Sequence, residues 1–137
     1  CSYMDGYSAA ATLTYSYPKA LTKAKKADQI LRGRLEKLGL SFEEVRTEFV
    51  GYNACHGPLA KELDEELINE IVFRIAVRSK DKESIDRFGK EIAPLILTGP
   101  PSVTGFAGGR PRPSDVVAYW PALIAKDLIT PKAIILE

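Results

Sequence analysis

Three segments of the chain alternate apolar and polar side chains. In the first, Leu13 and Tyr15 share one face with Tyr7 and the alanines between them, whereas the intervening positions are mostly serine and threonine. In the clearest, Ile71 and Phe73 face one way and Arg74 the other. A period of two is typical of a strand with one buried face. We therefore predict strands at residues 6–17, 43–53 and 70–78.

A second pattern, with apolar residues at steps of three and four, predicts a helix over residues 18–38. Pro18 suits the first position of this helix, and Gly39 suits the position that follows its last turn. The apolar stripe consists of Leu21, Ala24, Ala27, Leu31, Leu35 and Leu38.

Another such stripe predicts a helix that begins at Lys82 with Asp81 as its N-cap. Gly89 would let this helix approach a neighbour closely, and Pro94 should kink or end it. Leucines at steps of four also predict a short helix over residues 59–68. The buried stripe of the helix that follows Asp81 is Ile85, Phe88, Ile92 and Leu95.

Two apolar runs near the end of the chain, residues 115–120 and 132–136, predict a last main strand and a short terminal strand. The resulting order of strand, helix, strand, strand, helix, strand is the split βαβ arrangement of ferredoxin-like folds. We predict an α+β fold, a two-layer sandwich with a long Gly/Pro loop before the last main strand. The face of the sheet away from the helices must be solvated or cover another domain; it carries Ser8, Thr12, Thr14, Arg74 and Arg78.

The length of 137 residues suits a single α+β domain, which we place at residues 1–137. A net charge of +1 argues against a nucleic-acid partner, and no apolar run has the roughly 20 residues of a membrane span. Two cysteines make no disulfide framework, so we expect a reducing, cytoplasmic setting. Because the chain opens on Cys1 rather than methionine, we expect either a piece of a longer polypeptide or a chain whose first residues are missing.

Candidate chemistry is concentrated in residues 98–114, which hold four of the ten glycines, four of the nine prolines and two arginines. Prolines forbid conformations and glycines permit unusual ones, so this loop should be shaped rather than loose. Backbone amides at the glycines and a guanidinium clamp would suit an anion. The alternative is a structural loop or a subunit interface. The candidate ligand-binding residues are Gly105, Gly108, Gly109, Arg110 and Arg112.

Other reactive or aromatic residues carry weaker hypotheses. Cys55 and His56 are adjacent, so in an extended segment they point to opposite faces, and a buried cysteine beside a turn histidine is the favoured interpretation. One histidine and two cysteines do not supply the ligand spacings of a zinc site, so we predict no metal. Tyr119 and Trp120 suit either ligand stacking or, as we favour, the core.

Two blocks of the chain resemble a known family. The first is Asp5-Gly6-Tyr7 followed by Pro18-Lys19-Ala20-Leu21. The second, more specific block runs from Gly105-Phe106-Ala107-Gly108-Gly109-Arg110-Pro111 to Tyr119-Trp120-Pro121. They are similar to the C-terminal region of acyclic terpene utilisation (AtuA-like) proteins. The resemblance implies a larger α/β domain before this segment, and breakdown of branched acyclic terpenoids and related carboxylic acids as acyl-CoA thioesters.

Two hypotheses for function follow. In the first, the domain completes an enzyme for acyl-CoA or carboxylic acid substrates, of hydratase, lyase or related chemistry. Catalytic residues stay unassigned, and a coenzyme A thioester enters as substrate, with no cofactor in this segment. In the second, the domain is a non-catalytic assembly module for the larger α/β domain or a sister subunit. Under both we expect a homo-oligomer with no nucleic-acid or membrane partner.

Overall fold

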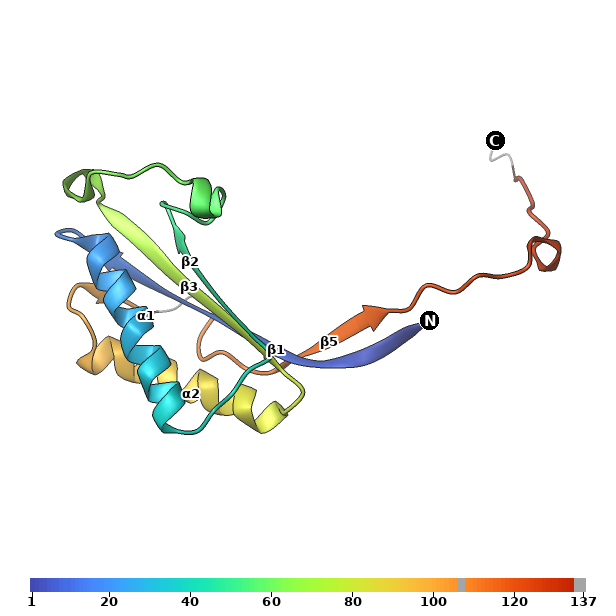
Figure 1. Cartoon of the computed structure of the whole chain (residues 1–137), viewed down its shortest axis with the longest axis horizontal. Helices are drawn as coiled ribbons and strands as arrows, with labels where there is room; N and C mark the ends of the chain where they lie inside the picture. Colours follow the sequence, from blue (N-terminus) through green and yellow to red (C-terminus); the bar gives the residue numbers. More distant parts are fainter. Residues whose placement is uncertain (106–107, 135–137) are drawn as a thin grey trace.

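The predicted order of strand, helix, strand, strand, helix, strand is confirmed in the computed structural model, which describes residues 1–105 and 108–134. Figure 1 shows both helices on one side of the sheet. The strands and helices, in chain order, are β1 (Ser2–Ser16), α1 (Ala20–Lys37), β2 (Glu44–Val50), β3 (Glu70–Ser79), α2 (Lys82–Thr98), β4 (Val103–Thr104) and β5 (Ser114–Tyr119).

The sheet is antiparallel and places its strands in the order β2-β3-β1-β4, with β5 also pairing with β1. This is the order expected of a split βαβ fold, and the predicted α+β class is confirmed. β4 pairs with β1 at Thr14 and Tyr15, whereas β5 pairs with the first half of β1, from Ser2 to Ser8. Two short strands therefore share the edge that one strand was predicted to fill, and the Gly/Pro segment connects them.

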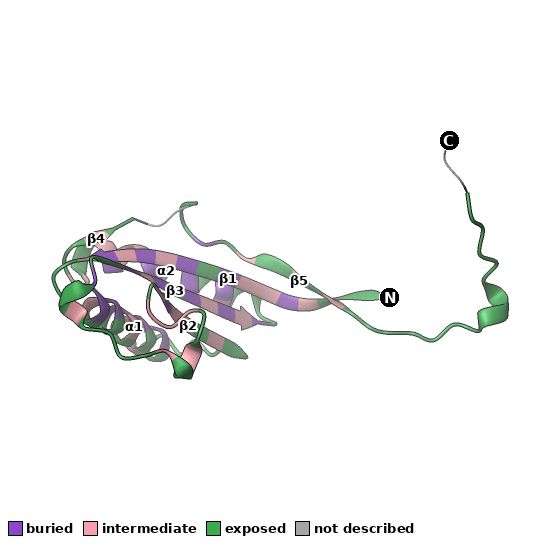
Figure 2. Ribbon diagram, turned by 90° about the horizontal axis from the view of Figure 1, so that it is seen from above, coloured by how far each residue is buried: buried purple, intermediate pink, exposed green. Residues whose placement is uncertain are grey.

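The core lies between the sheet and the two helices, and Figure 2 shows buried residues gathered there. The stripes predicted for α1 and α2 are buried except for Leu38, which is 43% exposed after the end of α1. Phe88 meets Phe42 edge to face, with ring centroids 6.2 Å apart. The fully buried large side chains are Leu13, Tyr15, Leu31, Ile71, Phe73, Ile75, Val77, Ile85, Phe88, Ile92 and Leu95.

The ends of α1 differ in part from the prediction. The helix begins at Ala20, because Lys19 has a left-handed φ of 56° and serves as its N-cap. Pro18 therefore lies in the preceding turn and not at the first helical position. The prediction for Gly39 is confirmed, since it has a φ of 69° and its amide donates to the carbonyl of Glu36 at 2.9 Å.

The predicted start of α2 is confirmed. At Pro94 the sequence predicted either a kink or the end of the helix; the end is wrong, and the kink stays a prediction. The Asp81 carboxylate accepts bonds from the amides of Glu83 and Ser84, each at 3.1 Å. The helix continues past Pro94 to Thr98. Burial of Leu95, which is 1% exposed, stabilises this last turn in spite of the hydrogen bond that proline cannot donate.

The predicted helix over residues 59–68 is absent; two short turns of 3-10 helix, Gly57–Leu59 and Glu65–Leu67, take its place. Leu59 and Leu67 are 87% and 80% exposed, because the two long helices already cover the apolar face of the sheet. Glu65 instead reaches the first turn of α1, where its carboxylate accepts from the Thr22 amide at 2.6 Å. This bond is the main reason that the pKa of Glu65 is lowered.

The prediction of a short strand at residues 132–136 is also wrong for residues 132–134, which have no regular structure. Ile134 is 81% exposed. Residues 135 and 136 lie outside the described residues. A run of apolar residues favours a strand only where another strand pairs with it, and none of the described strands does so.

Both helices lie on one face of the sheet (Figure 1), and the prediction that the other face is solvated or covers another domain stays a prediction. Charged side chains on this face pair with one another. Glu48 on β2 accepts from Arg74 on β3 and pairs with Arg46 at 2.8 Å. The hydrogen bond from Arg74 is the largest cause of the lowered pKa of Glu48. Small side chains, among them Ala10 and Ala76, lie beside this ionic cluster.

Tyr15 gives a first prediction, because its hydroxyl is buried without a hydrogen-bond partner among the described residues. Burial raises the pKa of Tyr15 to about 12. The native state holds the Tyr15 proton more tightly than the unfolded chain does. The free energy of unfolding therefore does not depend on this titration below pH 10, and it decreases as the pH rises from 10 toward 12. We expect Tyr15→Phe to raise the free energy of unfolding by about 1 kcal/mol at neutral pH. Urea unfolding at pH 7 and pH 11 measures both effects; a less stable variant at pH 7 would contradict the first.

Candidate functional site

The Gly/Pro segment follows a defined path between α2 and β5. After α2 ends at Thr98, Val103 and Thr104 pair with β1, and the chain then runs across α2 to Ser114. Pro111 is buried on Gly89, where an added Cβ would lie 2.2 Å from the Pro111 carbonyl oxygen. The close neighbour predicted for Gly89 is therefore the loop itself. Phe106 and Ala107 lie outside the described residues.

Four of the five candidate ligand-binding residues line one hollow. Its volume is about 450 Å³. Gly108 and Gly109 both have a φ of +80°, a conformation that other residues rarely adopt. Gly105 does not line this hollow, so the structure separates it from the other four. The lining residues are Ala10, Gly108, Gly109, Arg110, Pro111, Arg112 and Ser114.

The buried side of the loop orients its arginines. Pro111 packs inward, and the flanking Arg110 and Arg112 are exposed. Arg110 also lies close enough to α2 for its charge to help lower the pKa of Asp86. The larger cause of that shift is the hydrogen bond from Lys90, whose ammonium pairs with Asp86 at 2.6 Å. With Asp86 held by Lys90, the two guanidiniums give the hollow a positive character.

Backbone groups of β1 border the same hollow. Ser16 donates to Ser102 on the β4 side, whereas Tyr17 donates to Asn69 on the β3 side. Since this direction alternates along a strand, the amides of Ala10 and Thr12 point to the edge beside the loop. Between β4 and β5 no described strand pairs with this part of β1. The hollow thus combines arginine side chains with a part of β1 that no described strand pairs on this edge.

Sequence reasoning missed the contributions of Ala10 and Ser114 to this hollow. Ser8 of β1 pairs with Ser114 of β5, and this register brings Ala10 beside a loop about 100 positions later in the chain. The available signal was the small side chain of Ala10 on the solvent face of the predicted strand. Loop composition alone carries no information about strand register.

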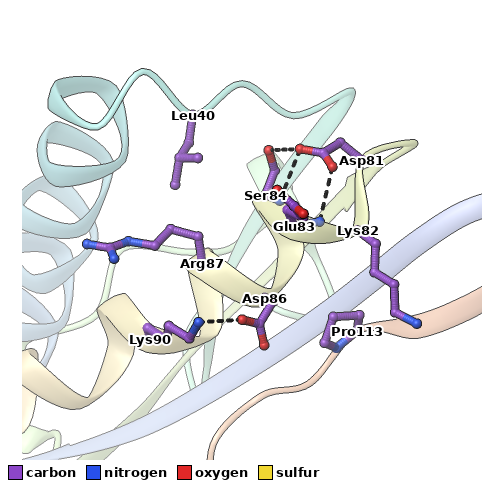
Figure 3. A pocket seen from close by; sticks show the side chains of 9 residues that line it. All are labelled: Leu40, Asp81, Lys82, Glu83, Ser84, Asp86, Arg87, Lys90 and Pro113. Carbon is purple, nitrogen blue, oxygen red and sulfur yellow. Dashed lines mark hydrogen bonds and ion pairs between the residues drawn. The ribbon is translucent and has the colours of Figure 1, made fainter.

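A larger hollow, of about 870 Å³, lies at the start of α2. Figure 3 shows Asp81 bonded to the first turn of the helix and Asp86 bonded to Lys90, while Pro113 of the loop forms part of the wall. Arg87, also in this wall, pairs with Glu91 at 2.8 Å. Because these charged groups already have partners, the hollow is a weaker candidate for a ligand than the one beside Arg110.

The comparisons with known proteins bear on the whole chain. A search of curated proteins finds no match. Among solved structures, the de novo designed protein Ferredog-Diesel aligns with a TM-score of 0.39 and 16% identity, over 74% of this chain and 86% of the design. The family described as "Acyclic terpene utilisation family protein AtuA" matches residues 1–135. The chain belongs to the AtuA family.

The remaining candidates of this AtuA-family chain lie apart from the arginine hollow. Cys55 and His56 are both exposed, so the prediction of a buried cysteine is wrong. They border another hollow, of about 340 Å³, beside β2. The described residues contain no group of three His, Cys, Asp or Glu side chains suited to a metal ion. None of the described helices is long and apolar enough to cross a membrane.

The aromatic pair at the end of β5 is not part of the core, contrary to the prediction. Tyr119 is 83% exposed and Trp120 is 65% exposed. Both lie where β5 and the start of β1 extend beyond the rest of the sheet and beyond both helices (Figure 1). In the described residues neither face of this two-stranded extension is covered, so the apolar pattern has nothing to pack against.

Proposed function

We propose that this chain is a component of an AtuA-family enzyme that acts on acyl-CoA or carboxylic acid substrates in the catabolism of terpenoids or branched acids. Its role is to bind the anionic part of the substrate, either a carboxylate or a phosphate of coenzyme A. The family description, which refers to the utilisation of acyclic terpenes, supports the substrate class. The observation that carries the binding role is the convergence of Gly108, Gly109, Arg110 and Arg112 on one hollow.

The chemistry of this hollow suits an oxyanion. Guanidinium groups bind carboxylate and phosphate with paired, charge-assisted hydrogen bonds. Backbone amides in left-handed or turn conformations add donors that carry no competing negative charge. The hollow is open rather than enclosed by the described residues, so the bulk of an acyl chain would extend beyond it. The reacting atoms would therefore lie on a neighbouring domain or subunit, and no catalytic residue is assigned within this chain.

Binding measurements test this role. We expect the double variant Arg110→Ala/Arg112→Ala to bind isovaleryl-CoA or isovalerate about 10- to 100-fold more weakly, because a hydrogen bond to a charged group contributes about 1.5–3 kcal/mol. Isothermal titration of each ligand, and of free coenzyme A, separates phosphate recognition from carboxylate recognition.

The matched control is Arg46→Ala, which removes a 76% exposed guanidinium from β2, two strands away from β1. We expect this control to bind as the unsubstituted chain does. Equal affinity in the double variant and the unsubstituted chain would exclude the anion-binding role. If Arg46→Ala weakened ligand binding as much as the double variant does, the effect would come from the net charge of the chain and not from the hollow.

The second candidate function is an assembly module for a larger α/β domain of the same protein or for a separate subunit. The apolar side chains left exposed beyond Tyr119 favour it, among them Leu123 at 106% and Leu128 at 72%. Here chemistry would lie wholly on the partner. Loss of association without any loss of ligand affinity, on substitution of these leucines, would favour this function over the first.

A further inference from the structure

The two outer edges of the sheet have opposite character. The edge formed by β2 carries three charged side chains, Glu44, Arg46 and Glu48, among its seven residues. The edge formed by β5 has one charge, at Asp115, followed by Val116, Val117, Ala118 and Tyr119. Natural proteins protect free strand edges with charges, prolines or bulges, because an unprotected apolar edge pairs with other strands. β5 therefore has the composition of a strand that is paired on both sides.

The backbone of β5 presents unpaired groups at this edge. Cys1 and Trp120 exchange hydrogen bonds, with the terminal amine donating at 3.1 Å and the Trp120 amide donating at 2.8 Å. The groups of Trp120 and, by alternation, Ala118 thus point toward β1. Those of Val117 and Tyr119 point away from β1, to the outer edge, where no described strand lies.

Both faces of the extension formed by β5 and the start of β1 are apolar. Residues paired across the strands share a face, so Met4, Val117 and Tyr119 lie on one side, at 54%, 52% and 83% exposure. Tyr3 and Trp120 lie on the other, at 44% and 65%. A two-stranded ribbon with no polar face is marginal in water and indicates that both sides are covered in the assembled protein.

Exposed apolar side chains continue along the chain beyond the ribbon. Figure 2 shows the segment from Pro121 to Ile134 leading away from the sheet. It is exposed along its length and contains one turn of 3-10 helix, Lys126–Leu128. Together the ribbon and this segment expose ten large apolar side chains, each at 44% or more. A stable interface buries roughly 800 Å² on each partner, and apolar side chains exposed in this number are typical of such a surface. The large apolar residues of this segment are Leu123, Ile124, Leu128, Ile129 and Ile134.

We propose that β5 pairs antiparallel with β5 of a second copy of this chain, about a two-fold axis near Val117. An antiparallel pair of identical strands is self-complementary, because each strand offers the same donors and acceptors to the other. The pairing joins the two sheets into one, and the segment from Pro121 to Ile134 of each copy then packs on its partner. The proposal is independent of the anion-binding role.

The test removes an outward-pointing amide without disturbing the bonds between β5 and β1. Val117→Pro does this, since proline lacks the amide hydrogen and is compatible with an edge strand. Sedimentation velocity of the full chain across the micromolar range should give a dimer for the unsubstituted protein and about tenfold or more weaker dimerisation for Val117→Pro. The matched control Val117→Ile keeps both the amide and the apolar side chain, and we expect it to remain dimeric.

A spectroscopic readout keeps the proposal testable if Val117→Pro does not fold. Trp120 is the only tryptophan and lies on the ribbon, so its emission should shift to shorter wavelength as concentration increases and the dimer forms. A monomer with unchanged Trp120 emission over the whole concentration range would overturn the proposal. So would a folded Val117→Pro variant that is as dimeric as the unsubstituted chain.

Discussion

Replacing Phe88 with alanine should lower the free energy of unfolding by about 3–5 kcal/mol, a large part of the ~5–15 kcal/mol that stabilises a typical domain. Phe88 is fully buried in the middle of α2 and packs edge to face on Phe42. Its removal loses both the transfer free energy of the ring and the contacts that its neighbours cannot replace. The variant should therefore unfold at a clearly lower urea concentration.

The control for this prediction lies on the same helix. Leu97 is 85% exposed, so Leu97→Ala should change stability by no more than about 0.5 kcal/mol. Urea unfolding followed by circular dichroism compares the two variants with the unsubstituted chain. Similar costs at Phe88 and Leu97 would mean that α2 does not cover the sheet as described.

The segments that the sequence predicts well are those whose periodic pattern is long and faces a single surface. The stripe from Leu21 to Leu35 extends over four turns, and every one of its members is buried on the sheet. Alternation in β3 likewise places Ile71 and Phe73 in the core. In these elements local pattern and tertiary packing agree, so the pattern alone is sufficient.

The predictions that are wrong share a different physical cause. Leu59 and Leu67 have helical spacing, and Trp120 follows an apolar strand, but each is exposed because no described element lies against it. An apolar pattern states that a surface is to be covered and does not state by what. Pro94 shows the converse, since burial of Leu95 sustains a helix that the local rule would end.

The candidate site divides in the same way. The positive φ angles at Gly108 and Gly109 are local requirements of the loop, and composition predicts them. The position of the loop beside Ala10 depends on the pairing of Ser8 with Ser114, which is a property of the whole sheet. The sequence therefore predicted the arginines and two of the glycines of the hollow, but not the contributions of Ala10 and Ser114.

The contact between Gly89 and Pro111 leads to a second prediction with a large effect. A glycine-to-alanine substitution should lower the free energy of unfolding at Gly89 and raise it at Gly33. Gly89→Ala places a Cβ 2.2 Å from the backbone oxygen of Pro111, so the loop must move away from α2. We expect a loss of about 1–3 kcal/mol in the free energy of unfolding, as for other overpacked sites. Gly33 lies in α1 with no atom within 4 Å of an added Cβ, so Gly33→Ala should instead stabilise the chain by about 0.5–1 kcal/mol.

The pair also separates the stability of the helices from the geometry of the proposed site. Pro111 lies between Arg110 and Arg112, so displacing it in Gly89→Ala moves both guanidiniums and should weaken anion binding, whereas Gly33→Ala should leave binding unchanged. Urea unfolding and isothermal titration with isovaleryl-CoA measure the two effects on the same samples. A Gly89→Ala variant that is destabilised but binds as before would show that the contact between Pro111 and α2 stabilises the fold and does not position the arginines. A variant that gains stability as Gly33→Ala does would show that the loop does not rest on α2, because only that contact distinguishes the two glycines.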